Sequence, residues 1–332
     1  MSVQANPASP RSFLSHVLTL GTGQMIAIAL PLFAAPVLGR IYTPADYGAL
    51  ALFMAATGVL SVVAALQMQH GIIAARTLVA AQALVWLVVL LALASAALVL
   101  VALLAATRLG ATPGWLWLLP FSAVLAGVMA GVTTLANRQN RYSALARLQV
   151  ATVAATVAGS IGFGVLGWGR NGLFGGYVLG QVVSFAICLR LFRAMMPATR
   201  PPSQRQLRAV GQRHRRFALF TLPGELLLSV TQQLPVFALG LLGAGAALGA
   251  FSRARRLAAM PVTLIGSATG QVFRADAAQL WHTTGSCRAL YLKTAATLFL
   301  VGALPCLAFM ATAPTLFTLY LGPDWREAGE IA

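Results

Sequence analysis

The chain has 332 residues, of which 59% are hydrophobic and only 9% are charged, and its mean hydropathy is +0.81. Soluble globular domains carry roughly 25% charged residues, so this composition excludes an ordinary soluble protein and indicates a polytopic membrane protein. A formal net charge of +17 would suggest nucleic-acid binding in a soluble chain. Here the basic residues lie in short spacers between apolar runs, where membrane proteins carry them, so no nucleic-acid partner is expected.

Nine apolar runs are long enough to span a bilayer, which takes about 20 residues. Runs of this length satisfy their backbone hydrogen bonds internally only as helices, so we expect an all-α polytopic membrane protein. The alternation of apolar and polar residues that is typical of a membrane β-barrel is not visible. The nine runs are Phe13–Leu38, Tyr47–Gln67, Leu78–Ala106, Trp115–Ala136, Leu148–Trp168, Gly172–Leu189, Phe217–Leu242, Ala247–Phe273 and Leu290–Leu319.

The lysine and arginine residues are distributed unevenly over the two sides of these nine runs. The side that carries the N-terminus receives 16 of them, and the other side receives 7. Cytoplasmic loops of membrane proteins carry an excess of basic residues, so the bias predicts a multi-pass protein with a cytoplasmic N-terminus.

The longest polar spacer, Arg190–Arg216, contains three prolines and many arginines. This composition predicts a cytoplasmic linker between two lobes, in contact with anionic lipid headgroups. The expected organisation is therefore an N-terminal lobe of six helices at 1–193, a basic linker at 194–216, and a partial C-terminal lobe of three helices at 217–332.

An internal repeat supports the two lobes, because transporters are often built from a duplicated half. Three pairs of segments match in the same order, the first two at an offset of about 204 residues: Leu30–Ala34 with Leu234–Ala238, Leu38-Gly39 with Leu242-Gly243, and Gly48-Ala49 with Gly249-Ala250. Both copies have the same predicted orientation, so an axis along the membrane normal would relate the halves. By this offset a second half would end at roughly position 400, which predicts a C-terminally truncated form of a longer protein.

Several longer motifs carry a family resemblance. They are Leu38–Phe53, Asn137–Arg147, Arg216–Pro223 continuing to Gln232–Pro235, Gly249–Pro261, and Gly270–Phe273. Together they resemble the Wzx-type polysaccharide biosynthesis proteins of the MOP (MATE-like) superfamily, and the resemblance runs from about Phe13 to the last residue.

The resemblance implies a MATE-like two-lobe helical bundle, with the first lobe complete and the second incomplete. It also implies a flippase of the bacterial inner membrane, which moves undecaprenyl-pyrophosphate-linked oligosaccharide to the periplasmic leaflet by alternating access. Such transport supplies O-antigen, capsule or exopolysaccharide assembly and needs no covalent chemistry, so an enzyme is not expected. The implied partners are the lipid-linked oligosaccharide, membrane lipids, and polysaccharide polymerase and export proteins.

Besides a non-transporting membrane scaffold or a degenerate remnant, which the predicted truncation favours, two alternatives stay open. One is a MATE-type drug or cation antiporter, although the motifs of the first loop and the seventh run argue against it. The other is a membrane enzyme of polysaccharide assembly, which would need a sizeable periplasmic loop with arginines or paired acids.

No cofactor or metal site is expected, because the three cysteines, Cys188, Cys287 and Cys306, are isolated and form no CxxC or His/Cys cluster.

The stretch Phe217–Arg256 holds the predicted site. Arg253 and Arg256 are three residues apart, so they share a helix face, whereas Arg255 points elsewhere. We expect Arg253 and Arg256 to line a central cavity near its periplasmic end and to attract the pyrophosphate, because arginine binds phosphate bidentately. The alternative is that both arginines extend to the outer interface and contact lipid phosphates.

Other polar residues within the apolar runs complete the predicted site. Glu225 follows Pro223-Gly224, a pair that can open the helix, and could couple transport to protons or sodium. It could instead pair with arginines at the cytoplasmic interface. Gln24, Gln232 and Gln233 could hydrogen-bond sugar hydroxyls across the cavity, or they could bond neighbouring helices.

Overall fold

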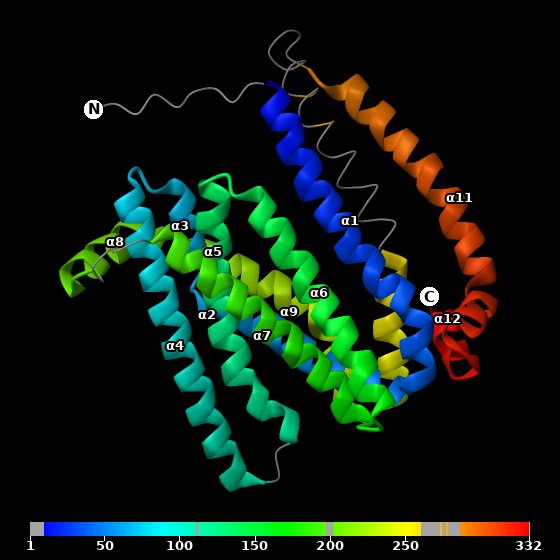
Figure 1. Cartoon of the computed structure of the whole chain (residues 1–332). Helices are drawn as coiled ribbons and strands as arrows, with labels where there is room; N and C mark the ends of the chain where they lie inside the picture. The colour runs from blue at the N-terminus through cyan, green and yellow to red at the C-terminus, as the bar shows by residue number, and fades with distance from the viewer. Residues whose placement is uncertain are drawn as a thin grey trace. The chain divides into compact units, whose positions relative to one another are not determined.

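The computed structural model describes residues 10–110, 113–196, 202–259, 273, 277 and 286–331, and all regular structure within these ranges is helical (Figure 1). The all-α class expected from the sequence is therefore confirmed. The elements are α1 (Pro10–Ile41), α2 (Pro44–Ala64), α3 (Gln69–Ala74), α4 (Leu78–Leu109), η1 (Gly114–Leu118), α5 (Leu119–Arg138), α6 (Tyr142–Val165), α7 (Arg170–Met195), α8 (Gln204–Arg216), η2 (Phe217–Thr221), α9 (Leu222–Leu241), α11 (Arg288–Leu321), η3 (Pro323–Trp325) and α12 (Arg326–Ile331). A further helical stretch covers residues 245–259.

Six helices of the described part of the chain are long and apolar enough to cross a membrane: Gly21–Ile41, Pro44–Ala64, Leu78–Arg108, Gly114–Arg138, Tyr142–Val165 and Arg170–Met195. They correspond to the first six predicted runs, so the chain is a membrane protein. The seventh run forms η2 and α9, whose Glu225, Gln232 and Gln233 lower its hydropathy, and α9 is not among the six. The ninth run forms α11, and most of the eighth run beyond residue 259 lies outside the described residues.

Small residues let the helices of the first half pack closely. Helix α4 runs beside α5, and α6 runs beside α7 (Figure 1). A Cβ atom on Gly127 of α5 would overlap the Cβ of Ala92 on α4, and one on Gly176 of α7 would overlap Ser160 on α6. Between lipid-embedded helices the hydrophobic effect offers little attraction, so such close contact between backbones supplies the packing energy.

The basic linker contains a helix that sequence reasoning did not identify. Ser203 caps α8 with a capping box, because its hydroxyl accepts from the backbone N–H of Gln206 and the Gln206 side chain accepts from the N–H of Ser203. The next turn, η2, is a π-helix in which the N–H of Leu222 reaches the carbonyl of Phe217. Proline at position 223 explains this widened turn, since its ring would clash with the carbonyl four residues earlier.

The chain divides into two compact units. Unit 1 comprises Met1–Ala34 and Ala49–Gly243, and unit 2 comprises Ala35–Gly48 and Ala244–Ala332. This division does not follow the predicted lobes, because the end of α1 and the start of α2 pack with the C-terminal part. For example, a Cβ atom on Gly39 would lie 2.7 Å from the carbonyl oxygen of Leu321. The six-helix N-terminal lobe, the basic linker and the partial C-terminal lobe of three helices stay a prediction.

Within unit 2, two glycines at matching positions of the internal repeat make matching contacts between helices. A Cβ atom on Gly48 would overlap the carbonyl oxygen of Gly245, and one on Gly249 would overlap the carbonyl oxygen of Pro44. Gly249 follows Gly48 by 201 residues, and the stretch 245–259 begins 201 residues after the first residue of α2. The two copies therefore start their helices at equivalent positions and cross each other through equivalent glycines, as expected for the two copies of an internal repeat.

Candidate functional site

The first turn of α2 is fixed by its own side chains. Thr43 precedes Pro44, which suits the first helical position because it lacks an N–H and has a fixed φ. The backbone N–H and the hydroxyl of Thr43 donate to Oδ2 of Asp46 at 3.1 and 2.8 Å, and the N–H of Asp46 donates back to the hydroxyl at 3.4 Å. This capping box fixes the direction in which Tyr47, the next residue, leaves the helix.

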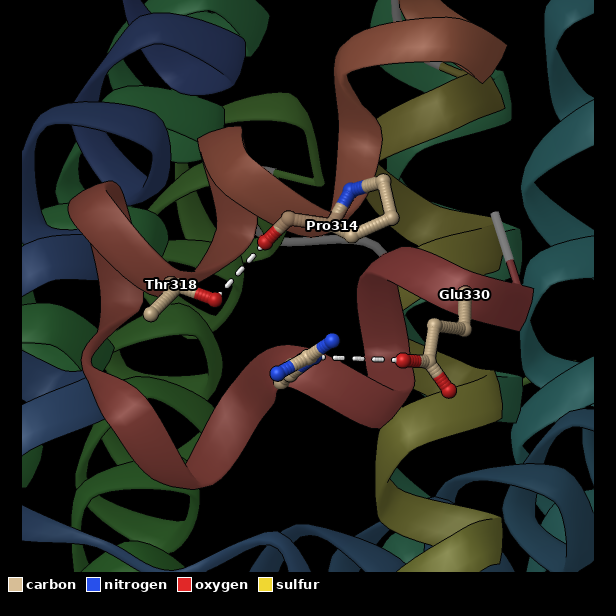
Figure 2. Close-up of polar contacts among 4 residues, drawn as sticks. Pro314, Thr318 and Glu330 are labelled. Carbon is tan, nitrogen blue, oxygen red and sulfur yellow. Dashed lines mark hydrogen bonds and ion pairs between the residues drawn. The ribbon is translucent and has the colours of Figure 1, made fainter.

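The corner between α11 and α12 places Trp325. Helix α11 ends at Leu321, and Gly322 takes a φ of +118°, which side chains of L-residues rarely allow. Figure 2 shows two contacts beside this corner: Thr318 donates to the carbonyl of Pro314 at 2.7 Å, and the carboxylate of Glu330 lies 3.3 Å from Arg326 Nε. The short turn η3 then directs the Trp325 ring into the interior of unit 2, where it is fully buried.

Tyr42, Tyr47, Arg253 and Trp325 form an arginine–aromatic cluster within unit 2. The guanidinium carbon of Arg253 lies 4.5 Å from the ring centroid of Tyr47 and 5.8 Å from that of Trp325. The Tyr47 ring meets Trp325 edge to face at 5.3 Å and Tyr42 at 6.4 Å. Trp325 Nε1 donates to the carbonyl of Gly39 at 3.0 Å, which ties the cluster to the end of α1. Two aromatic faces thus stabilise the cation without neutralising it.

The polar atoms of this cluster are incompletely satisfied. Nε and Nη2 of Arg253 and the hydroxyl of Tyr47 are buried, and none of them forms a hydrogen bond of good geometry with a described residue, although the Tyr47 hydroxyl lies close enough to Arg253 to interact with it. Burial, together with the neighbouring Tyr47 and Asp46, raises the pKa of Tyr42 to about 12, so its hydroxyl stays neutral at physiological pH. An unpaired buried donor costs about 1–3 kcal/mol, and more when it is charged, so the cluster is suited to an anion that accepts from Arg253.

The structure separates the two predicted cavity arginines by their surroundings. Arg253 is partly buried, and no sequence pattern predicted its aromatic partners Tyr47 and Trp325. Arg255 and Arg256 are both exposed on the same helical stretch. The spacing of Arg253 and Arg256 along the helix predicted that they share one face. Only Arg253 has aromatic partners, because α2 and the turn η3 bring Tyr47 and Trp325 to it.

The remaining predicted site residues belong to unit 1. Gln24 on α1, and Gln232 and Glu225 on α9, are exposed, whereas Gln233 is half-buried. Nε2 of Gln233 lies 3.6 Å from the position that a Cβ on Gly58 of α2 would occupy, so this amide packs against a neighbouring helix. Unit 1 therefore holds the predicted sugar contacts and the predicted coupling residue, and unit 2 holds the predicted pyrophosphate contacts.

Replacing Trp325 with phenylalanine should lower the free energy of unfolding by about 1–3 kcal/mol, because the buried carbonyl of Gly39 loses its donor. Phenylalanine keeps an aromatic ring at this position, so part of the packing against Tyr47 is retained. Thermal denaturation of the purified protein in detergent measures the change. The matched control is Trp117→Phe, since the Trp117 side chain is 42% exposed and its replacement should leave the midpoint in place. Equal midpoints for the two variants would contradict a structural role for the indole N–H.

Comparison with known proteins gives one family. The model of the family described as "Polysaccharide biosynthesis protein" matches residues 37–330, which include all four residues of the arginine–aromatic cluster. No curated protein matches the chain. No solved structure matches it either.

Proposed function

Because the chain belongs to the polysaccharide biosynthesis protein family, we propose that it is a flippase for undecaprenyl-pyrophosphate-linked oligosaccharide in the bacterial inner membrane. The observation that carries this proposal is the state of Arg253, a cation enclosed by aromatic rings with two buried donors left for a ligand. A pyrophosphate supplies the acceptors that these donors lack, in the fork geometry that guanidinium recognises best. Six helices of the described part of the chain are long and apolar enough to cross a membrane, as a flippase requires.

Arg253 acts in this proposal by electrostatics alone. An anion passing through a low-dielectric interior needs fixed positive charge, and each charge-assisted hydrogen bond contributes roughly 1.5–3 kcal/mol. The cation–π contacts with Tyr47 and Trp325 hold the guanidinium in place before the ligand arrives, which reduces the entropy lost on binding. Arg256, which is exposed, would contact the ligand at an earlier or later stage of its passage.

The sugar chain would be held by neutral groups. Amide side chains both donate and accept, so Gln24, Gln232 and Gln233 can hydrogen-bond hydroxyls without fixing one glycan. We assign these three residues to the sugar path of an alternating-access cycle, with the N-terminus in the cytoplasm. The polysaccharide polymerase and export proteins would then take up the translocated product.

Replacing Glu225 with glutamine should remove the dependence of transport on proton or sodium gradients, because it removes the one carboxylate of α9. The side chain is exposed, so the thermal stability should not change. Transport into vesicles at several imposed pH and sodium gradients measures the effect. Glu330→Gln, which removes an exposed carboxylate on α12, is the control. A Glu225→Gln variant with an unchanged gradient dependence would eliminate the coupling role.

Complementation tests the proposal as a whole. The chain is expressed in a panel of strains whose own polysaccharide flippases have been deleted, and surface glycan and the intracellular pool of lipid-linked oligosaccharide are measured together. We expect surface glycan to return in at least one strain while the intracellular pool falls. If no strain recovers and the chain instead raises resistance to cationic drugs, the antiporter function replaces this proposal. If the pool of precursor changes in chemical structure, the chain is an assembly enzyme.

A further inference from the structure

Helix α8 has two different faces, which its sequence determines. Leu207, Val210, Gly211 and His214 follow the i, i+3, i+4, i+7 pattern and face the protein: His214 is buried, and a Cβ on Gly211 would lie 3.4 Å from Leu87 of α4. The other positions are exposed and include five arginines but no acidic residue. An exposed basic face on a helix packed against a membrane span is typical of helices that lie at the membrane surface.

A pocket of about 480 Å³ lies between α4 and α8, and both helices belong to unit 1. Its wall includes Val79, Ala83 and Trp86 of α4 and Gln206, Ala209 and Val210 of α8. Leu78 and Val79, the first two residues of the α4 span, are 48% and 71% exposed. Exposed apolar side chains beside a basic helix place the pocket where hydrocarbon meets the headgroup region.

Two polar features point to a ligand in this pocket. The indole Nε1 of Trp86 is buried and has no acceptor among the described residues, although the ring packs edge to face on Phe192 at 5.4 Å. Arg205 lies one turn before Ala209 of the pocket wall, and Arg213 lies one turn after it. Residues four apart share a helix face, so a cation lies on each side of Ala209 along this face of α8. Neither arginine forms an ion pair with a described residue.

We propose that this pocket binds an anionic phospholipid. Arg205 and Arg213 hold the headgroup phosphate, the apolar side chains of Val79, Ala83 and Val210 contact one acyl chain, and the Trp86 N–H donates to a phosphate or ester oxygen. An acidic protein segment would satisfy the arginines but would not use an apolar wall that opens at the start of a membrane span. This lipid site is separate from the arginine–aromatic cluster and does not depend on the proposed transport function.

The experiment uses the full chain in neutral detergent and follows the quenching of tryptophan fluorescence by phosphatidylglycerol with brominated acyl chains. Six tryptophans contribute, so the Trp86 signal is the part of the quenching that disappears in Trp86→Phe. We expect this part to saturate with brominated phosphatidylglycerol and to be at least about ten-fold weaker with brominated phosphatidylcholine. Unbrominated phosphatidylglycerol should displace the quencher, whereas free glycerol phosphate should not.

Charge-matched variants distinguish binding of the lipid in this pocket from its general attraction to the basic helix. Arg205→Gln with Arg213→Gln should weaken binding about ten-fold or more, and so should Ala209→Phe, which fills the pocket from an exposed position. Arg208→Gln with Arg215→Gln removes the same charge from two positions that lie on the side of α8 away from Gln206 and Val210 of the pocket wall, and should change the affinity less than two-fold. Equal weakening by both double variants, unaltered binding in Ala209→Phe, or displacement of the lipid by polyglutamate alone would overturn the proposal.

Discussion

Gly249→Ala is expected to lower the free energy of unfolding by about 2–3 kcal/mol, although alanine is the better helix former. The reason is the crossing of α2 with the stretch 245–259, where an added Cβ would overlap the carbonyl oxygen of Pro44. Backbone atoms cannot rotate away as a side-chain end can, so both helices must move apart. Thermal or denaturant unfolding of the purified protein in detergent measures the loss.

The control for this prediction lies one turn earlier on the same helix. Nothing lies within 4 Å of the position that a Cβ on Gly245 would occupy, so Gly245→Ala makes the same chemical change without a clash. It should leave the stability unchanged or raise it slightly, by less than about 1 kcal/mol. By the reciprocity of the contact, Gly48→Ala should behave as Gly249→Ala does. A stable Gly249→Ala variant would show that the glycine crossing is not closely packed.

Arg253→Gln is expected to reduce the rate of oligosaccharide translocation about ten-fold to a hundred-fold, because the ligand loses its charge-assisted hydrogen bonds. Glutamine keeps two N–H donors but is neutral and shorter than arginine, so this variant removes both the charge and the reach of the guanidinium. Arg253→Lys should recover only part of the rate, since an ammonium group cannot present the fork that binds two phosphate oxygens. Translocation assays at saturating and limiting substrate measure both variants.

Arg255→Gln is the matched control, because it removes the same charge from an exposed position two residues away on the same helical stretch. It should transport at the native rate. Equal reductions in Arg253→Gln and Arg255→Gln would indicate that net basic charge, and not a bound anion at the arginine–aromatic cluster, governs transport. A folding defect is recognised separately, because Trp325→Phe disturbs the same cluster without changing its charge.

The helices could be predicted well from the sequence, because apolar runs of membrane length can satisfy their backbone only as helices. The matched pair Gly48 and Gly249 also indicated the internal repeat, and in the structure these residues are the crossing points of two equivalent helices. Helix α8 was missed because a spacer rich in arginine and proline resembles a linker. Its apolar stripe of Leu207, Val210, Gly211 and His214 was the available signal.

The arginine–aromatic cluster could be predicted only in part. The position of Arg253 near the start of an apolar run predicted either a cavity cation or an arginine at the outer interface, and both readings depend on local sequence alone. Its neighbours Tyr47 and Trp325 lie about 200 residues before it and 72 residues after it, and their approach depends on how α2 and the corner after α11 pack. Tertiary contacts of this kind leave no periodic pattern in the sequence, so the aromatic partners of Arg253 could not be predicted.

The most direct test of the proposed function is translocation in reconstituted vesicles. Undecaprenyl-pyrophosphate-linked oligosaccharide is placed in the inner leaflet, and its appearance in the outer leaflet is followed with a membrane-impermeant lectin or glycosidase. We predict transfer that requires the protein, proceeds at the native rate with Arg255→Gln and slows with Arg253→Gln. Transfer equal to that of protein-free vesicles would contradict the flippase function, and transfer that is indifferent to Arg253 would contradict the role of the cluster.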